Sequence, residues 1–406
     1  MRPTRAGSKG ATDMNRYHRQ MLLPQIGPVG QAKLAAARVL LVGCGALGSH
    51  IAEQLVRAGV GFLRLVDRDI VELTNLQRQV LFDEKHAIAG WPKAAAAAER
   101  LGEINSQVRV EPRVIDLHAG NIESEILSDV ILRYSDGSAQ SELPHRSFGV
   151  PQDDSRSGSN SSFDHSSLIR HSDFVIRHSP QIDLILDGTD NVATRYLLND
   201  VAVKHGISWV YGACVGVEGR VMAIRPGHTP CLRCIFPTAP KPEELATCDT
   251  AGVLGPAAAI VASLQVVAAL KLLTGNESAL PDELLTIDLW SNRFHGLSLK
   301  DARRSDCPCC GLGQFEFLSR PPDESAVTLC GRDAVQIRGE GSIQLSTLAD
   351  RWRVIGTVEQ TRFFVRCQLT DPADLRLTLF EDGRLIVQGT RDAARAKSLY
   401  ARYVGS

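Results

Sequence analysis

The chain has 406 residues, of which 44% are hydrophobic, and its formal net charge at pH 7 is −1. This length is sufficient for one large core domain and at least one smaller unit. A nearly neutral chain gives no electrostatic reason to expect nucleic acid or an anionic membrane as a partner, and we find no apolar run of transmembrane length. These totals predict a cytoplasmic protein that binds neither nucleic acid nor membrane.

The chain begins with a polar segment and a helical arm. Residues 1–14 lack the apolar core of a signal peptide, so we expect them to form a disordered tail. The next segment, 15–36, has the pattern of a helix and is interrupted by glycine and proline at Gly27-Pro28. The folded part of the chain is therefore expected to start near residue 15.

A glycine-rich turn lies between two predicted strands. The first strand, 39–42, is followed by a G-x-G-x-x-G whose glycines are Gly43, Gly45 and Gly48, and the second strand ends on Asp67. Such glycines let the backbone approach a phosphate, the helix N-terminus favours its negative charge, and an acid about 20 residues further on binds ribose hydroxyls. This unit is expected to bind an adenine nucleotide.

Strands and helices then alternate as far as residue 318. After a polar connector at 83–90 we expect helices at 93–104 and 118–127, and strands at 108–114, 182–186, 208–211, 219–224 and 284–289. Residues 129–179, approximately, are rich in serine, aspartate and histidine, which indicates a low-complexity insert. A nearly all-apolar helix at 252–274 should be buried in a core or a subunit interface. The pattern predicts an α/β fold, a doubly wound Rossmann-like mixed sheet over residues 15–318.

Residues 325–406 are predicted to form a separate, small α+β domain. Its expected strands lie at 334–337, 363–369, 376–380 and 385–388. Asp382-Gly383 is a hairpin signal between the last two strands, and a helix at 392–403 closes the domain.

Three polar residues after the glycine turn favour phosphate chemistry over hydride transfer. Asn75 and Arg78 would place an amide and a cation beside the phosphates, where a nicotinamide site needs an apolar floor. Lys93 adds a second cation at a helix start, a position that the helix dipole disfavours. Arg78 and Lys93 could therefore stabilise charge that develops in nucleotidyl transfer. The alternative is that each is an exposed, solvated charge.

Two aspartates, Asp187 and Asp190, follow the strand at 182–186, at the sheet edge that binds ligands in doubly wound folds. An acid there can hold Mg²⁺ against a triphosphate. One of the two is also expected to cap the helix that follows. We assign the metal to Asp190.

Ten cysteines are too few for a disulfide scaffold in a chain of this size, but four of them have the spacing of a metal site. Cys231 and Cys234 form one C-x-x-C pair, and Cys307 and Cys310 form another, a donor set that fits tetrahedral zinc. The long separation between the pairs indicates a structural site that joins two distant segments. Cys309 is an alternative ligand to Cys310.

In combination these motifs resemble the ThiF/MoeB/HesA family, the bacterial relatives of ubiquitin-activating enzymes. The matching stretches extend from Arg16 to Cys310 around the insert and include RYHRQ, GCGALGS, DRDIVELTNLQRQ, DGTDN, CLRC, TCDTAGVLGP and CPCCG. The resemblance implies that the chain uses Mg²⁺-ATP to adenylate the C-terminal glycine of a small ubiquitin-like sulfur carrier that ends in Gly-Gly. It further implies a structural Zn²⁺ and a homodimer, with a cysteine desulfurase as a candidate second partner.

The resemblance also implies roles for single residues. The three glycines would line the nucleotide, with Asp67 on the ribose. Asn75, Arg78 and Lys93 match phosphate-contacting positions, and Asp190 matches the catalytic acid linked to Mg²⁺. Arg19 matches an arginine that reaches the ATP of the partner subunit.

Cys248 precedes the long apolar helix, where a thiolate is favoured, so it is a candidate nucleophile or else an ordinary small residue at a helix start. It matches a cysteine that in the ThiF branch can become linked to the carrier. MoeB-like members carry one too, so Cys248 does not separate a thiamin from a molybdopterin pathway. The C-terminal domain resembles the tail of some ThiF-type members and favours thiamin.

Two other functions remain open on sequence grounds. A nicotinamide dehydrogenase can be built on the same glycine turn, and tight NADH binding without ATP binding would identify it. A non-catalytic scaffold would hold a carrier without activating it, and carrier binding without pyrophosphate release would identify that case.

Overall fold

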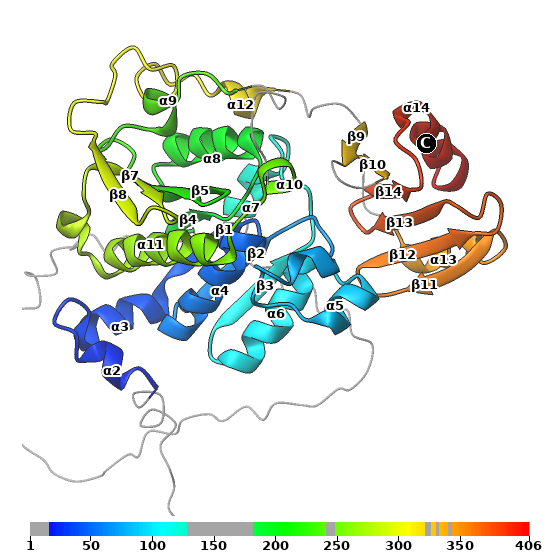
Figure 1. The fold of residues 1–406 in the computed structure, drawn as a ribbon, viewed down its shortest axis with the longest axis horizontal. Helices are drawn as coiled ribbons and strands as arrows, with labels where there is room; N and C mark the ends of the chain where they lie inside the picture. The colour runs from blue at the N-terminus through cyan, green and yellow to red at the C-terminus, as the bar shows by residue number, and fades with distance from the viewer. Residues whose placement is uncertain are drawn as a thin grey trace, which may run out of the picture.

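The computed structural model describes residues 16–127, 182–240, 248–320, 326–329, 333–339 and 343–405, without the side chains of 248–249 and 326–329. The predicted tail at 1–14 and the predicted insert at about 129–179 lie outside the described residues. Within the described residues the chain forms two β-sheets, one in a large α/β part and one in a smaller C-terminal part (Figure 1).

The large sheet has eight strands in the order β3-β2-β1-β4-β5-β6-β7-β8. The strands from β3 to β5 are parallel and the remaining pairs are antiparallel, so the predicted doubly wound mixed sheet is confirmed. The bounds are β1 Arg38–Val42, β2 Phe62–Val66, β3 Arg109–Arg113, β4 Leu184–Asp187, β5 Ser208–Val215, β6 Glu218–Ile224, β7 Glu283–Asp288 and β8 Arg293–Ser298. Strand β8 was not predicted, because every one of its residues is exposed and it carries no buried apolar face.

Helices cover both faces of the large sheet. In β1, Val39 and Leu41 point into one core layer, and Leu40 and Val42 point into the other. The first layer is closed by α4 (Ala46–Ala58), α6 (Lys93–Ile104) and α11 (Gly255–Thr274), and the second by α7 (Ile122–Leu127) and α8 (Val192–His205). Because both faces are buried, the parallel strands read as continuous apolar runs in the sequence.

Helix α11 corrects the expectation that the chain has no apolar run of transmembrane length. It has 20 residues and an 18-residue window of mean hydropathy 1.9, so by length and composition alone it could cross a membrane. Half of that window is buried, and the helix packs against α4, β5 and β6, which is the behaviour of a core helix. Ile260 and Val267 lie on its uncovered face.

Three local predictions in the first part of the chain were wrong in detail. Gly27-Pro28 begins α3 (Gly27–Ala36) rather than interrupting a helix, since proline is tolerated in a first turn. The predicted connector at 83–90 contains α5 (Glu84–Ala89), whose N-terminus is capped by the Asp83 side chain. The helix predicted from residue 118 begins only at Ile122.

The C-terminal sheet has six antiparallel strands in the order β11-β12-β13-β14-β10-β9. Their bounds are β9 Ala326–Leu329, β10 Ala334–Ile337, β11 Gly356–Gln360, β12 Phe364–Leu369, β13 Arg376–Phe380 and β14 Leu385–Gln388. Four of these strands and α14 (Ala393–Tyr403) lie where they were predicted, whereas β9, β11 and α13 (Leu345–Trp352) were not predicted.

The two faces of the C-terminal sheet have different neighbours. Helices α13 and α14 cover one face and form a core of their own. On the other face Phe364, Phe380 and Ile386 pack against Ile70 and Val114 of the large α/β part. In Figure 1 this sheet accordingly stands beside the region of β3 and α5. The boundary between the two parts, at residues 318–325, stays a prediction.

Candidate functional site

The glycine turn between β1 and α4 is shaped by contacts of the backbone with itself. Gly43 has a φ of +89°, and a Cβ there would lie 2.6 Å from the carbonyl oxygen of Gly188. A Cβ at Gly48 would collide with the Gly43 carbonyl oxygen. At Gly45, by contrast, the nearest atom to a Cβ would be Nε2 of Gln79 at 3.8 Å. Gly43 and Gly48 are thus required by the fold, whereas the space beside Gly45 is open among the described residues.

Asp67, at the end of β2, ties the two strand ends together. Its Oδ2 accepts a hydrogen bond of 2.6 Å from the backbone N–H of Cys44, and its Oδ1 accepts one of 2.7 Å from Asp69 N–H. Burial raises the pKa of the Asp67 carboxyl, and the nearby charge of Lys93 opposes this rise. Each carboxylate oxygen has a second lone pair, so a ribose hydroxyl can still donate to Asp67.

Lys93 is buried, with 5% of its surface exposed, and it is paired with an acid that the sequence analysis did not select. Its Nζ lies 3.0 Å from Oδ2 of Asp69. Burial would lower the pKa of Lys93, but the charges of Asp69 and Asp67 outweigh burial and raise it. The unfavourable position of Lys93 at a helix start is therefore compensated within the chain. The sequence signal for this partner was the second aspartate in Asp67-Arg68-Asp69.

Asn75 and Arg78 lie on the segment that follows. Asn75 is buried, and its Oδ1 accepts a 3.0 Å hydrogen bond from Glu72 N–H in a capping box around the short helix Leu73–Asn75. Arg78 donates from Nη1 to the Thr74 carbonyl oxygen at 2.8 Å and forms no ion pair with any described carboxylate. The guanidinium of Arg78 thus remains available to an anion, and the amide of Asn75 is partly used by the fold.

Gln79, which the sequence analysis did not select, also lies at the turn. It is 3% exposed, and its Oε1 has no hydrogen-bond partner among the described residues. A buried amide oxygen without a partner is costly, and Nε2 of the same amide is the atom nearest to the open space at Gly45. No periodicity or spacing in the sequence distinguishes Gln79 from the neighbouring polar residues.

The two aspartates after β4 have different environments. Asp187 is fully buried, pairs with Arg195 at 2.9 Å and accepts from Thr189 N–H, and its pKa is raised by burial against the charge of Arg195. Asp190 is exposed, and its side chain forms no hydrogen bond or ion pair with described residues. Neither aspartate caps α8: the cap is Asn191, whose Oδ1 accepts from Thr194 N–H at 3.0 Å. The expected aspartate cap is therefore wrong.

The charge of Asp190 reaches the cations around the turn. Burial lowers the pKa of Lys93, Arg68 and Arg195, nearer carboxylates raise it above its usual value, and Asp190 adds a smaller raising contribution to each. The structure thus gathers the glycine turn, Lys93 and Asp190 at the carboxyl edge of the parallel strands, where ligands bind in such sheets. The donor set, one free carboxylate beside a cradle for phosphates, fits Mg²⁺.

Arg19 and Cys248 are not brought to this edge by described contacts. Arg19 is exposed on α2 (His18–Met21), which packs against α3. Cys248 begins the short helix α10 (Cys248–Ala251), but its side chain is outside the described residues. The chain that follows does approach the site, because a Cβ at Gly255 would lie 3.1 Å from the carbonyl oxygen of Gln77.

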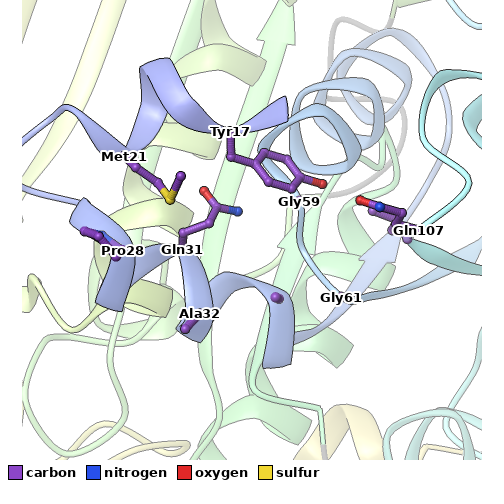
Figure 2. Close-up of a pocket in the computed structure, with 10 residues that line it drawn as sticks. Tyr17, Met21, Pro28, Gln31, Ala32, Gly59, Gly61 and Gln107 are labelled. Carbon is purple, nitrogen blue, oxygen red and sulfur yellow. The ribbon is translucent and has the colours of Figure 1, made fainter. Parts of the chain in front are cut away.

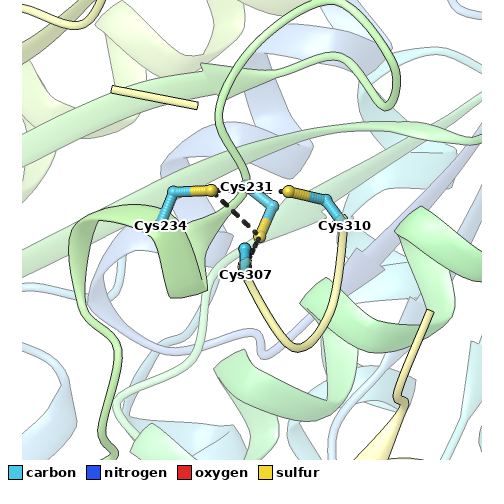
Figure 3. A group of neighbouring side chains, drawn as sticks. All are labelled: Cys231, Cys234, Cys307 and Cys310. Carbon is cyan, nitrogen blue, oxygen red and sulfur yellow. Dashed lines mark hydrogen bonds between the residues drawn. The ribbon is translucent and has the colours of Figure 1, made fainter. Parts of the chain in front are cut away.

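The four predicted zinc ligands form one cluster, in which the sulfur atoms all lie within 4.8 Å of one another (Figure 3). The Sγ atoms of Cys231 and Cys307 are 3.6 Å apart, and those of Cys234 and Cys310 are 3.4 Å apart. Four sulfurs at the Zn–S distance of about 2.3 Å in a tetrahedron would be about 3.8 Å apart. The fourth member of the cluster is Cys310, whereas Cys309 accepts a hydrogen bond of 3.2 Å from Asn199 and also contacts the Cys231 thiol.

A separate cavity of about 340 Å³ lies between the N-terminal arm and the loop from α4 to β2 (Figure 2). Its wall includes Tyr17, Met21 and Gln31 and none of the predicted site residues. The Gln31 amide is already bonded, because it donates to the Ala58 carbonyl at 3.0 Å and accepts from Gln20 at 2.7 Å. This cavity therefore offers no polar group that lacks a partner, and we assign it no ligand.

Comparison with solved structures supports the fold. The crystal structure of E. coli MccB with ATP aligns with a TM-score of 0.52 and 20% identity, over 73% of this chain and 74% of that one. MccB with MccA-N7isoASN aligns with a TM-score of 0.53 and 18% identity, over 75% and 76% of the two chains. At such low identity these matches establish the arrangement of elements alone.

Comparison with curated sequences goes further. The sulfur carrier protein ThiS adenylyltransferase of Bacillus subtilis (strain 168) is 39% identical over 393 residues, which cover 96% of this chain and 99% of that protein. The sulfur carrier protein adenylyltransferase of Thermus thermophilus is 34% identical over 74% of this chain and 91% of its own length. The ThiF family profile matches residues 17–140 and 163–309, more than half of the chain. The chain belongs to the ThiF family.

Proposed function

We propose that the chain adenylates the C-terminal glycine of a small ubiquitin-like sulfur carrier, with ATP as the second substrate. The observation that carries the proposal is the grouping of Lys93, Asp69 and the unpaired Asp190 around a glycine turn with open space at Gly45. A nicotinamide ring would not need this set of charges. Two relatives that are named for sulfur carrier adenylation support the same function, one matching 96% of this chain and the other 74%.

In the proposed reaction a carboxylate oxygen of the carrier attacks the α-phosphorus of ATP. The new C–O–P bond forms as the bond from the α-phosphorus to the bridging oxygen breaks, and pyrophosphate leaves with that electron pair. The attacking carboxylate is ionised at neutral pH, so no general base is needed. The work of the site is to align the two anions and to stabilise negative charge.

Each of the site residues has its own proposed contact with the substrate. The backbone at Gly43, Gly45 and Gly48 would hold phosphate and Asp67 the ribose, while Asn75, Arg78 and Lys93 would contact the phosphates. Asp190 would hold Mg²⁺, which supplies charge neutralisation on phosphate oxygens when it is bound.

ATP–pyrophosphate exchange tests the proposal directly. Purified chain, Mg²⁺-ATP, labelled pyrophosphate and a carrier ending in Gly-Gly should give labelled ATP, and a carrier that lacks its last glycine should not. Exchange that is absent with both carriers, in a chain that binds ATP, would contradict the proposal and favour a carrier-binding scaffold. A gene for a small Gly-Gly-ended protein beside the gene of this chain would identify the carrier. We propose a carrier of the thiamin pathway rather than one of the molybdopterin pathway.

We also propose that the cysteine cluster holds one structural zinc. Cys310→Ser is expected to lose zinc from about one ion per chain to near zero and to lower the melting temperature, because a closed site needs all four ligands. Cys309→Ser is the matched control, since its neighbour is Asn199 and serine keeps an acceptor there. Metal analysis of both purified variants decides: zinc retained in Cys310→Ser and lost in Cys309→Ser would reverse the assignment.

The proposed homodimer places Arg19 of one protomer at the ATP of the other. Arg19→Ala and Asp190→Asn chains, each inactive alone, should regain exchange when refolded together, because a mixed dimer has one site with both residues intact. About a quarter of the wild-type activity is the upper expectation for random mixing of equal amounts. If the mixture stays as inactive as its components while mixed dimers are present, Arg19 does not act across subunits.

Two further proposals concern sulfur transfer. A cysteine desulfurase would be the partner that supplies sulfur, by passing the outer sulfur of its persulfide to the Cys248 thiolate and leaving with its own thiolate. The Cys248 persulfide would then attack the carbonyl carbon of the carrier adenylate, so that the bond to AMP breaks, AMP leaves and an acyl disulfide links Cys248 to the carrier. Mass spectrometry under non-reducing conditions tests the second: a carrier adduct that persists in Cys248→Ser would exclude this residue.

A further inference from the structure

Two chain segments carry the buried ion pair of the site, and hydrogen bonds join them. Val71 N–H donates to the Trp91 carbonyl at 2.7 Å, and Lys93 N–H donates to the Asp69 carbonyl at 2.8 Å. Ile70 and Pro92 face each other as an isolated antiparallel bridge. We call residues 68–71 and 89–93 together the Asp69–Lys93 bridge. Its position decides where the Lys93 ammonium and the Asp69 carboxylate lie.

The C-terminal sheet contacts both segments of this bridge. From the turn before β14, Arg384 donates from Nη1 to the carbonyl oxygen of Arg68 at 2.6 Å. From β12, Arg366 lies 3.4 Å from the carbonyl oxygens of Ala89 and Gly90. Arg384 is 1% exposed, and its guanidinium stacks 4.0 Å above the Phe380 ring. A guanidinium buried this completely is held in one place by its surroundings.

A chain of charges extends from the same sheet toward Asp190. Arg338 pairs with Asp116 at 2.8 Å, and Asp116 pairs with Arg68 at 2.9 Å. Burial would raise the pKa of Asp116, but Arg68 and Arg338 outweigh burial and lower it. Arg68 in turn lies within the field of Asp190. The C-terminal part therefore contacts the carboxyl edge of the large sheet through charged groups as well as through Phe364 and its apolar neighbours.

We propose that the C-terminal sheet positions the phosphate site for its nucleoside triphosphate, with Arg384 as the principal positioning residue. Arg384 holds the main chain between Asp67 and Asp69, and Arg366 holds the main chain before Lys93. Neither touches the nucleotide; both act through the Asp69–Lys93 bridge. A sheet that only covered apolar surface would need the contacts to Ile70 and Val114 but not a buried cation on a backbone carbonyl. The inference rests on the proposed function for the identity of the ligand.

The test compares Arg384→Met with Arg384→Lys and with Arg391→Met, all in the full chain. Methionine keeps an apolar contact with Phe380 but removes the donor to Arg68, and with it the ion pair of Nε with Asp382 at 3.5 Å, whereas lysine restores one donor and the charge. Arg391 is the matched control because it lies in the loop just after β14, its side chain is 75% exposed, and it pairs only with Asp333 among described residues. The readouts are the Kd for Mg²⁺-ATP by calorimetry without carrier, and KM and kcat in pyrophosphate exchange.

Arg384→Met is expected to raise both the Kd and the KM for ATP about tenfold, with kcat and the KM for carrier changed less than threefold. Tenfold corresponds to about 1.4 kcal/mol, within the range for losing a hydrogen bond from a charged donor. Arg384→Lys should recover part of the loss, and Arg391→Met should match the wild type. Should Arg384→Met fail to fold, Arg366→Met takes its place, with the same expectation in direction.

The outcome that overturns the inference is a folded Arg384→Met chain with a lowered melting temperature but an unchanged Kd and KM for ATP. That result would make the sheet a stabilising cover only. A wild-type chain that binds ATP but shows no exchange would contradict the proposed function, and the calorimetric comparison would still decide this inference.

Discussion

Asp190→Asn is expected to lower ATP–pyrophosphate exchange by at least about a hundredfold and to leave the fold unchanged. The side chain is exposed and forms no bond with described residues, so its removal disturbs no packing. What the substitution removes is the negative charge that would hold Mg²⁺ on the triphosphate, and single electrostatic contributors of this kind are worth about 10² to 10³ in rate. Exchange kinetics with saturating Mg²⁺ and a thermal melt measure the two effects.

The matched control for Asp190→Asn is Asp187→Asn, three residues earlier. Asp187 is fully buried and pairs with Arg195, so its neutralisation leaves a buried cation without a partner. We expect it to lower stability by about 3 kcal/mol and the melting temperature accordingly. Activity retained in Asp190→Asn, at more than a tenth of the wild-type rate, would remove this residue from the mechanism.

Much of the site at the carboxyl edge of the parallel strands could be predicted from the sequence, because it is built from local sequence patterns. The parallel strands are continuous apolar runs, and Gly43 and Gly48 stand where the backbone passes too close to Gly188 and to itself for any side chain. The four cysteines could be paired from their spacing, since two C-x-x-C loops can share one ion. The strands and the glycine turn can be recognised from residues a few positions apart. The cysteine pairs can be recognised because all four sulfur atoms can bind the same ion.

Other features depend on contacts that no local pattern encodes. The sequence left open whether Lys93 contacts phosphate or is an exposed charge, because its burial and its pairing with Asp69 arise from the contact of residues 68–71 with the start of α6. Asp187, Asp190 and Asn191 are all competent caps, and only the direction of the turn selects Asn191.

Of these contacts, the one between the C-terminal sheet and the carboxyl edge of the large sheet joins the residues that are furthest apart in the chain. Arg384 and Arg68 are 316 residues apart in the chain, and Arg366 and Ala89 are 277 apart. The sequence predicts four of the six strands of this sheet, most clearly β12 and β13, in which polar and apolar residues alternate. The sequence does not indicate which face of the sheet meets another part of the chain, since arginines on a strand or in a turn are usually exposed to solvent.

Lys93→Met is expected to lower exchange by about 10² to 10³ and also to destabilise the fold. The activity falls because a cation beside the phosphates is lost. Stability falls because Asp67, which is buried, and Asp69 lose the charge that compensates them. Removing one partner of a buried pair costs about 3–5 kcal/mol, and since Asp69 is 36% exposed we expect about 2 kcal/mol.

The stability loss in Lys93→Met should depend on pH with a definite sign. Burial already raises the pKa of Asp67, and Lys93 is the charge that opposes the rise, so the variant raises this pKa further. An acid whose pKa is higher in the folded than in the unfolded state binds protons more readily when folded, and lowering the pH then favours the folded state. Urea unfolding should therefore show a smaller deficit against wild type at pH 5 than at pH 8.

The double variant Lys93→Met/Asp69→Asn separates the two roles of Lys93. Neutralising Asp69 removes one of the carboxylates left without a partner, so part of the lost stability should return. Exchange should stay as low as in Lys93→Met, because the cation at the phosphates is still absent. If the double variant regains exchange together with stability, Lys93 serves the fold alone. If Lys93→Met keeps exchange within tenfold of wild type, the charge that develops on the leaving pyrophosphate must be met by other groups, of which Arg78 is the nearest candidate in sequence.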